Sequence, residues 1–288
     1  MKIGIISDKF KDPGFHIARS VSEILNGYGV ETVFPDTRTE HQVEQSSGDE
    51  LWEGVDLAIS IGGDGTFLYT SKEVYLHEIP LIGINRGSLG FMTEIHMSDL
   101  QESLKKLANG EYFITDRMML DVAIYDENDA LLHRGFGLND AVLYRGDISK
   151  IIPCRLYIND TYIQTILSDG IIIAAPSGST GYAMSAGGPI IDPELELMLV
   201  TPLSPHSLMN RSYAVNHNDH IELKINREYP YSPTLSVDGR EGIKITNKQR
   251  ISIKKAEKDL HIAAINKREF FAGLPDKLNA RGMGRNEN

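Results

Sequence analysis

The chain has 288 residues, a formal net charge of −11, 41% hydrophobic and 24% charged residues, and a single cysteine, Cys154. This composition is typical of a globular protein long enough for about two domains, and its acidity argues against broad nucleic-acid binding. The sequence has no apolar run of about 18 residues and begins without a signal-peptide pattern, so we expect no membrane association and a cytoplasmic location.

The first hundred residues alternate short apolar runs with amphipathic stretches. Strands are predicted at 2–7, 30–34, 55–61 and 80–84, and helices at 15–29 and 67–76. Because strand–helix–strand alternation favours parallel pairing, residues 1–100 are predicted to form an α/β domain with a Rossmann-like sheet.

From about residue 117 the pattern changes to short strands separated by turn residues. Hairpins are predicted within 118–135 and 154–167, a strand at 220–225, and a tight turn at Asp238-Gly239. A helix at 99–112 links the two halves. We therefore expect an all-β domain at 101–265, and an α+β protein overall. Residues 266–288 form a C-terminal segment, for which packing back on the first domain is one option, and the polar end 278–288 is expected to fray.

The segment GGDG, residues 62–65, follows an apolar strand and precedes a helix. Ligands of open α/β sheets bind at such strand ends, and the free N–H groups of a helix start favour anions. The loop lacks the lysine of a P-loop, and Asp64 is an unexpected neighbour for phosphate. A carboxylate there could orient and deprotonate a hydroxyl or hold magnesium, or it could simply cap the helix.

A second glycine loop, GINRGSLGFMTEI at 83–95, follows the next predicted strand. Two consecutive parallel strands bring both loops to one edge of the sheet, where the ring of Phe91 could face a base. Ordinary packing at a domain boundary is the alternative interpretation.

Two polar segments stand out in the β-rich half. Asn139-Asp140 precedes an apolar run, and an amide beside a carboxylate can bind ribose hydroxyls, although an Asx turn has the same sequence pattern. The segment SDGIIIAAPSGSTGYAMSAGGPIIDP, 168–193, combines a strand with a long stretch of small and hydroxyl residues that could line a nucleotide. It contains no G-x-S-x-G elbow, which disfavours a nucleophilic serine.

Taken together, these segments resemble the NAD kinase family. GGDGTFL resembles the glycine-rich catalytic motif of the family, and GINRGSLGFMTEI resembles the loop that follows this motif. LNDAVLYRG is similar to the Asn-Glu motif, with Asp140 in place of the glutamate. Residues 168–193 together with TPLSPHSLMNR resemble the longest block of the family. The resemblance covers roughly residues 55 to 270.

This resemblance implies phosphorylation of the 2′-hydroxyl on the adenosine ribose of NAD by ATP or polyphosphate, giving NADP, with Mg²⁺ or another divalent metal and a homodimer or homotetramer. It implies that Asp64 is the catalytic base. It assigns the dinucleotide to Gly63, Gly65, Phe91, Asn139, Asp140, Lys150, Asp169, Thr180, Gly181, Tyr182 and Ser185, and it gives no residue as a metal ligand.

Two other functions have to be weighed against this one. A lipid kinase with a GGDG loop would want an apolar groove or a basic, membrane-facing surface, which the acidic composition disfavours. A dinucleotide sensor without catalysis would not need Asp64.

Overall fold

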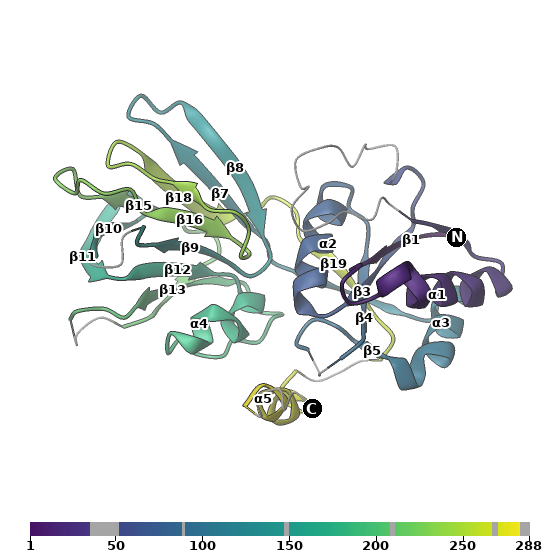
Figure 1. Ribbon diagram of the computed structural model, residues 1–288. Coiled ribbons are helices and arrows are strands. Elements are labelled where there is room, and N and C mark those ends of the chain that lie inside the picture. Colours follow the sequence, from purple (N-terminus) through teal and green to yellow (C-terminus); the bar gives the residue numbers. More distant parts are fainter. Residues whose placement is uncertain (35–51, 88–89, 147–149, 208–210, 267–269, 283–288) are drawn as a thin grey trace. The chain divides into compact units, whose positions relative to one another are not determined.

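The computed structural model describes residues 1–34, 52–87, 90–146, 150–207, 211–266 and 270–282 (Figure 1). The chain forms two compact units, Met1–Asp116 together with Leu260–Asn288, and Arg117–Asp259. No helix among the described residues has the length and apolar character needed to cross a membrane.

The first unit contains a seven-stranded sheet with the order β2-β1-β3-β4-β19-β6, and β5 pairs with β4. Its strands are β1 Lys2–Ser7, β2 Glu31–Val33, β3 Leu57–Gly62, β4 Leu81–Asn85, β5 Ile95–His96, β6 Phe113–Arg117 and β19 Leu260–Ala264. The pairs formed by β1 with β2 and β3, and by β4 with β3, β5 and β19, are parallel. The predicted parallel α/β sheet is therefore confirmed.

Helices cover both faces of this sheet (Figure 1). The helices α1, His16–Gly27, and α3, Leu100–Ala108, pack against the face that carries the alternate isoleucines of β1, β3 and β4. The opposite face receives α2, Asp64–Leu76, whose Thr70 hydroxyl reaches Ser60 of β3. The strict alternation of side chains along a strand produces these two faces.

The limits of the units differ from the predicted boundary at residue 100. Helix α3 belongs to the first unit because Leu100, Leu104 and Leu107 join the core formed by α1 and the sheet. Strand β19 returns to the same sheet after the β-rich unit, so the first unit is built from both ends of the chain.

The second unit consists of two six-stranded sheets in which all the described pairs are antiparallel. One sheet has the order β11 Thr161–Ser168, β10 Ile152–Ile158, β15 Ile221–Ile225, β18 Arg250–Lys255, β7 Leu120–Tyr125 and β8 Leu131–Gly137. The other has the order β14 Tyr213–Asn216, β13 Leu197–Leu203, β12 Gly170–Ala174, β9 Asp140–Tyr144, β16 Thr234–Val237 and β17 Ile243–Lys244. The predicted β-rich half and both of its hairpins are confirmed.

One apolar core includes residues of both sheets, among them Leu143 and Ile173 of one sheet and Leu156 and Ile253 of the other. Cys154 lies in this core, and burial raises the pKa of its thiol to about 12. A thiol with so high a pKa is not a nucleophile, so Cys154 has a packing role.

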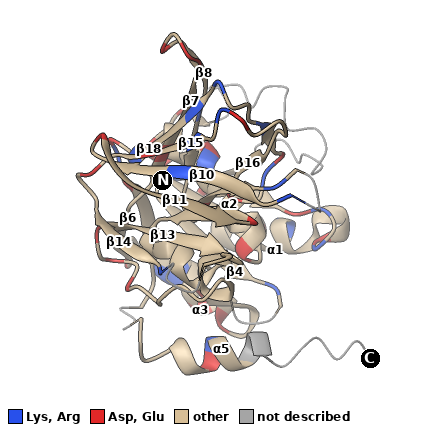
Figure 2. Cartoon of the chain, turned by 90° about the vertical axis from the view of Figure 1, so that its left-hand side faces the viewer, with Lys and Arg blue, Asp and Glu red and all other residues tan. Residues whose placement is uncertain are grey.

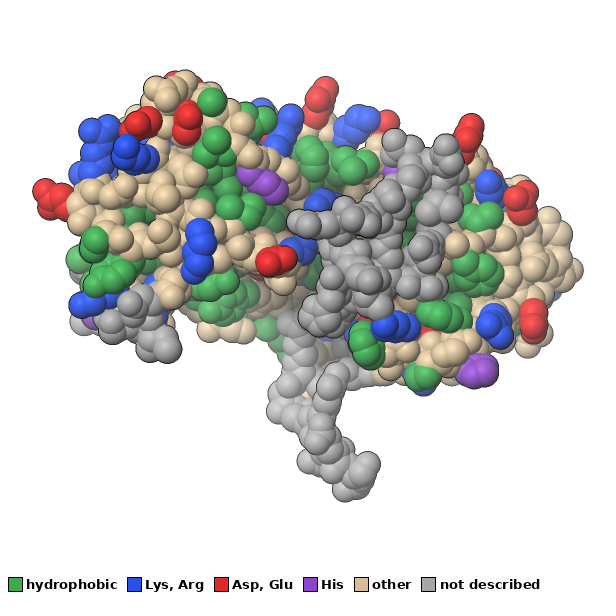
Figure 3. Space-filling view, turned by 45° about the horizontal axis from the view of Figure 1, so that its top comes forward, with side chains coloured by type: hydrophobic (Ala, Val, Ile, Leu, Met, Phe, Trp, Pro, Cys, Tyr) green, Lys and Arg blue, Asp and Glu red, His purple; other side chains and the backbone are tan. Residues whose placement is uncertain are grey.

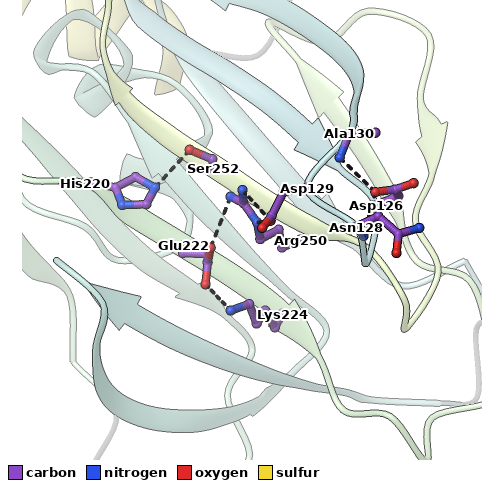
Figure 4. A network of polar contacts seen from close by, with 9 residues as sticks. All are labelled: Asp126, Asn128, Asp129, Ala130, His220, Glu222, Lys224, Arg250 and Ser252. Atoms are coloured by element: carbon purple, nitrogen blue, oxygen red, sulfur yellow. Dashed lines mark hydrogen bonds and ion pairs between the residues drawn. The ribbon is translucent and has the colours of Figure 1, made fainter.

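Charged residues bind one another on the sheet that contains β15 and β18. The buried Glu222 contacts Lys224 and, at 3.2 Å, Arg250, which also binds Asp129 (Figure 4). Basic and acidic residues are interspersed along the strands of this unit (Figure 2). The arrangement satisfies a buried carboxylate, as folding requires.

The C-terminal segment contains a helix that the sequence did not predict. Helix α5 covers Leu274–Gly282, so the prediction of fraying is wrong for 278–282; the remainder, 283–288, lies outside the described residues. The side chain of Lys277 donates to the carbonyl oxygen of Phe91 at 3.4 Å and lies 5.5 Å from the centre of its ring. These contacts connect α5 with the second glycine loop of the first unit.

Leu104→Ala should lower the unfolding free energy of the first unit by about 2–5 kcal/mol, because it removes a fully buried side chain between α1 and the sheet. Urea unfolding followed by the fluorescence of Trp52, the only tryptophan, reports this unit. Gln101→Ala on the exposed side of α3 is the control and should change little. An unchanged midpoint in Leu104→Ala would contradict the packing described here.

Candidate functional site

The first group of candidate residues lies where β3 ends and α2 begins. Gly63 occupies the N-cap position of α2, and Asp64 is the first residue of the helix. The predicted start at residue 67 is therefore three residues late. A side chain at Gly62 would collide with Thr66, so the turn needs this glycine in order to close. Gly65 is exposed on the first turn of α2.

The carboxylate of Asp64 binds the second glycine loop. Its Oδ2 accepts the backbone N–H of Phe91 at 3.0 Å, and its Oδ1 accepts that of Met92 at 3.1 Å. A Cβ on Gly90 would overlap Asp64 Oδ1, so only glycine allows the loop to approach this closely. Asp64 is thus oriented by a distant loop, a role that differs from the helix-cap alternative.

Parallel pairing brings the two loops together, as predicted. Gly62 at the end of β3 lies opposite Asn85 at the end of β4, and Arg86 N–H donates to the carbonyl of Gly62. Phe91 is partly buried at this edge of the sheet.

A cation that the sequence analysis did not single out lies beside the GGDG loop. Lys11 Nζ is 3.9 Å from the position that a Cβ on Gly63 would occupy, and 3.5 Å from Asp8 Oδ2. Its side chain is half exposed. The predicted strand order could have indicated this position. Strand β1 is also a parallel neighbour of β3, so the residues that follow β1 reach the same edge of the sheet as the GGDG loop.

The second group lies at the start of β9 in the other unit. Among the described residues no group donates to the buried Oδ1 of Asn139, so the alternative of an Asx turn at this residue does not apply. The missing Cβ of Gly181 would lie 3.7 Å from Asn139 Nδ2 and 3.8 Å from Asp140 Oδ2. The structure therefore brings Asn139, Asp140 and Gly181 together.

Asp140 has a carboxylate neighbour, Asp238, which the sequence analysis treated only as a turn residue. Burial, and then the negative charge of Asp238, raise the pKa of Asp140 to about 7. Burial also raises the pKa of Asp238, although the backbone N–H groups of residues 138–140 and the charge of Arg240 oppose the shift. At neutral pH the pair does not carry two full negative charges.

The small-residue block follows β12 as a 3₁₀ helix, Pro176–Thr180, and the short helix α4, Tyr182–Ser185. The hydroxyl of Thr180 donates to the carbonyl of Ser177 at 3.3 Å, and Ser179 both donates to and accepts from the backbone of Ile191. Tyr182 and Ser185 are exposed on α4. These hydrogen bonds fix the conformation of residues 177–191, and the N–H of Ala175 just before them donates to the carbonyl of Asn139.

Two of the predicted binding residues lie apart from this group. Asp169 forms an ion pair with Arg145 at 3.0 Å. This ion pair lies at the opposite end of the β9–β12 pair from Asp140, so Asp169 and Asp140 are about 17 Å apart along the strand. Lys150 is exposed, with its Nζ 6.0 Å from the ring centre of Tyr231. Neither is part of the cluster formed by Asn139, Asp140 and Gly181.

Comparisons with known proteins cover nearly the whole chain. The ATP-NAD kinase N-terminal domain family matches residues 12–112, and the ATP-NAD kinase C-terminal domain family matches residues 138–265. The NAD kinase of Ruminiclostridium cellulolyticum is 33% identical over 97% of this chain and 98% of its own. That of Caldanaerobacter subterraneus subsp. tengcongensis is 36% identical over 97% of this chain and 99% of its own.

Solved structures agree with these matches. The NAD kinase from Archaeoglobus fulgidus in complex with ATP has a TM-score of 0.75 and 25% identity, over 97% of this chain and 99% of that one. Yeast NADH kinase complexed with NADH has a TM-score of 0.80 and 19% identity, over 100% of this chain and 89% of that one, and shows the shared fold. The chain belongs to the NAD kinase family of phosphotransferases.

Proposed function

We propose that this protein transfers the γ-phosphoryl group of ATP to the 2′-hydroxyl on the adenosine ribose of NAD, giving NADP. The observation that carries the proposal is the geometry of Asp64. Its carboxylate lies at the end of β3, among glycines suited to phosphate, and is held by the N–H groups of Phe91 and Met92. Family membership supports NAD and ATP as the substrates.

In this reaction Asp64 orients the acceptor hydroxyl and takes its proton as the new O–P bond forms. Phosphoryl transfer depends chiefly on positioning and on neutralising charge. A carboxylate fixed by two backbone donors is already in place before the substrate arrives. Gly63 and Gly65 leave the backbone around Asp64 accessible to the phosphates.

The dinucleotide is proposed to bind Asn139, Asp140, Thr180, Gly181, Tyr182 and Ser185, with Phe91 against a ring, and Lys150 and Asp169 at a separate position. The unpartnered Oδ1 of Asn139 fits this role, because a buried acceptor without a partner is costly until a ligand hydroxyl donates to it. Asp169 and Asp140 lie about 17 Å apart along the strand. They contact one NAD molecule only if the dinucleotide is extended or if they belong to different subunits.

Magnesium is proposed to enter with ATP. Among the residues that the structure describes, no group of three or more His, Cys, Asp or Glu could hold a metal ion. Mg²⁺ does not need such a group, because it is commonly bound by phosphate oxygens and water with only one or two carboxylates. Two carboxylates lie at the GGDG edge: Asp64 itself, and Asp8, whose Oδ2 accepts from the Thr66 hydroxyl at 3.5 Å. Magnesium bound there would neutralise phosphate charge.

The two other functions have less support. On the face that Figure 3 presents, basic, acidic and hydrophobic side chains are intermixed, whereas a lipid kinase would gain from a basic surface. A sensor without catalysis would not need a carboxylate held as Asp64 is. The single buried cysteine and the acidic charge favour the cytoplasm as the location.

The assay that tests the proposal couples product formation from NAD, ATP and Mg²⁺ to an NADP-specific dehydrogenase. The wild-type protein should give a signal that disappears when Mg²⁺ is chelated. Asp64→Asn should reduce kcat by about 10²- to 10⁴-fold, because the proton acceptor is lost and the amide nitrogen cannot accept one of the two N–H groups of Phe91 and Met92. NAD affinity should stay within about threefold, because most of the proposed NAD contacts are made by residues 139–185. Asp99→Asn, an exposed carboxylate in the same unit, is the control. Near-wild-type turnover in Asp64→Asn would remove this residue from the mechanism.

Lys11 is proposed to neutralise phosphate charge beside Gly63. Lys11→Met should raise the KM for ATP or lower kcat by about 10- to 100-fold, the loss expected for one charged hydrogen bond. The matched control is Lys9→Met, which removes a lysine whose Nζ lies over the ring of Phe10 at 5.0 Å. Equal kinetics of the two variants would show that Lys11 has no special role.

We further propose a homodimer or homotetramer. The edge strand β11 exposes Tyr162, Ile163 and Leu167, and an apolar edge strand is a common site of association. Light scattering should give two or four times the chain mass of 32.0 kDa. A monomer at assay concentration would contradict this.

A further inference from the structure

We propose that Asp238 is the positioning residue of the dinucleotide site, which holds Asn139 and Asp140 in the geometry that binds a ribose. The inference rests on the proposed function and extends it to a residue that does not itself touch the substrate.

The carboxylate of Asp238 accepts three backbone N–H groups from consecutive residues. Leu138 donates to Oδ2 at 2.8 Å, and Asn139 and Asp140 donate to Oδ1 at 2.8 and 3.0 Å. The N–H of Asp238 donates in return to the carbonyl of Asp140 at 2.9 Å. Residue 238 thus binds the very segment that presents the amide and the carboxylate.

The fold brings these residues together through strand pairing. β16 runs antiparallel to β9, with Val237 opposite Ala141, so the next residue of the hairpin reaches the start of β9. Asp238 and Gly239 have φ angles of 51° and 70°, as a tight hairpin turn requires. The carboxylate is buried, although the turn that carries it is partly exposed.

The turn alone does not explain an aspartate at this position. Asn-Gly forms the same kind of tight turn as Asp-Gly, and asparagine adopts a positive φ at least as readily. What asparagine cannot supply is two oxygens that accept three N–H groups, because its amide nitrogen is a donor. The unit keeps a buried carboxylate beside Asp140, and the three N–H donors and the charge of Arg240 compensate its burial.

The same segment is fixed from its other side by the small-residue block. The N–H of Ala175 donates to the carbonyl of Asn139 at 2.8 Å, and a Cβ on Gly178 would overlap the backbone of Asn139. The peptide of Asn139 is therefore clamped between Asp238 and the backbone of 175–178. The side-chain Nδ2 of Asn139 lies near Gly181, and no described residue donates to its Oδ1.

A shift of this peptide would move both polar side chains relative to the ribose. Hydrogen bonds are lost over a few tenths of an ångström to one ångström, so the loss should appear in NAD affinity. It should not appear in ATP affinity, because no ATP contact is assigned to residues 138–140.

The test compares Asp238→Asn with Asp160→Asn. Asp160 has a φ of 62° in the exposed turn between β10 and β11, so it is matched in residue type and backbone conformation. NAD binding is measured by calorimetry without ATP, and KM and kcat by the coupled assay. We expect Asp238→Asn to weaken NAD binding and raise the KM for NAD at least about tenfold. The KM for ATP should stay within about twofold, and Asp160→Asn should match the wild type.

Wild-type NAD affinity in Asp238→Asn would overturn the inference. So would a parallel loss of NAD affinity, ATP affinity and melting temperature, which indicates a purely structural role. If Asp238→Asn does not fold, Asp238→Glu keeps the charge but displaces the oxygens by one methylene, and unchanged NAD binding in that variant would overturn the inference equally. A wild-type protein that binds NAD without phosphorylating it would refute the proposed function, while the binding comparison would still decide the role of Asp238.

Discussion

Both groups of candidate residues depend on the same interaction: the hydrogen bonds from backbone N–H groups of a segment far away in sequence to the carboxylate of an aspartate. Asp64 binds the loop at Phe91 and Met92, and Asp238 binds the peptides of residues 138–140. In each case the hydrogen bonds to charge fix both partners, since such bonds are stronger than neutral ones. In the proposed reaction Asp64 acts on the substrate itself, whereas Asp238 is proposed to fix residues that bind the substrate.

Glycine makes these close approaches possible. Gly90 lets the second loop reach Asp64, Gly178 lets the small-residue block lie on the backbone of Asn139, and Gly181 leaves space beside Asn139 and Asp140. A Cβ at either of the first two positions would collide with its neighbour. The low bulk of these segments is therefore a requirement of close contact around the site, which explains why the sequence offers so few core-like residues there.

The elements that the sequence predicted are those specified by local pattern. Alternation and turn residues sufficed for the hairpin of β7 and β8, and the strand order around GGDG placed the two glycine loops at one edge. The positions of Lys11 and Asp238 beside the candidate residues were missed because their neighbours lie far away in sequence and are brought near by strand pairing. Asp238 was also missed because the Asp-Gly pair is explained by the tight turn that it forms, and this explanation suggested no further role. Helix α5 was missed because its sequence is polar, and its described anchor is a contact of Lys277 with Phe91.

The negative net charge of the protein also favours recognition of the substrates by groups close to them. A chain with a net charge of −11 that binds two phosphate-bearing substrates cannot rely on a basic surface to attract them. The attraction has to come from groups close to the phosphates, and those proposed here are the N–H groups at the start of α2, the ammonium of Lys11 and a metal ion that enters with the nucleotide. Near Asn139 the proposed ligand group is a ribose, which is uncharged. There the raised pKa of Asp140 reduces the negative charge that a neighbouring diphosphate would meet. The buried pair of Asp140 and Asp238 carries less than two full negative charges and is therefore compatible with an anionic ligand. Two fully ionised carboxylates would repel such a ligand.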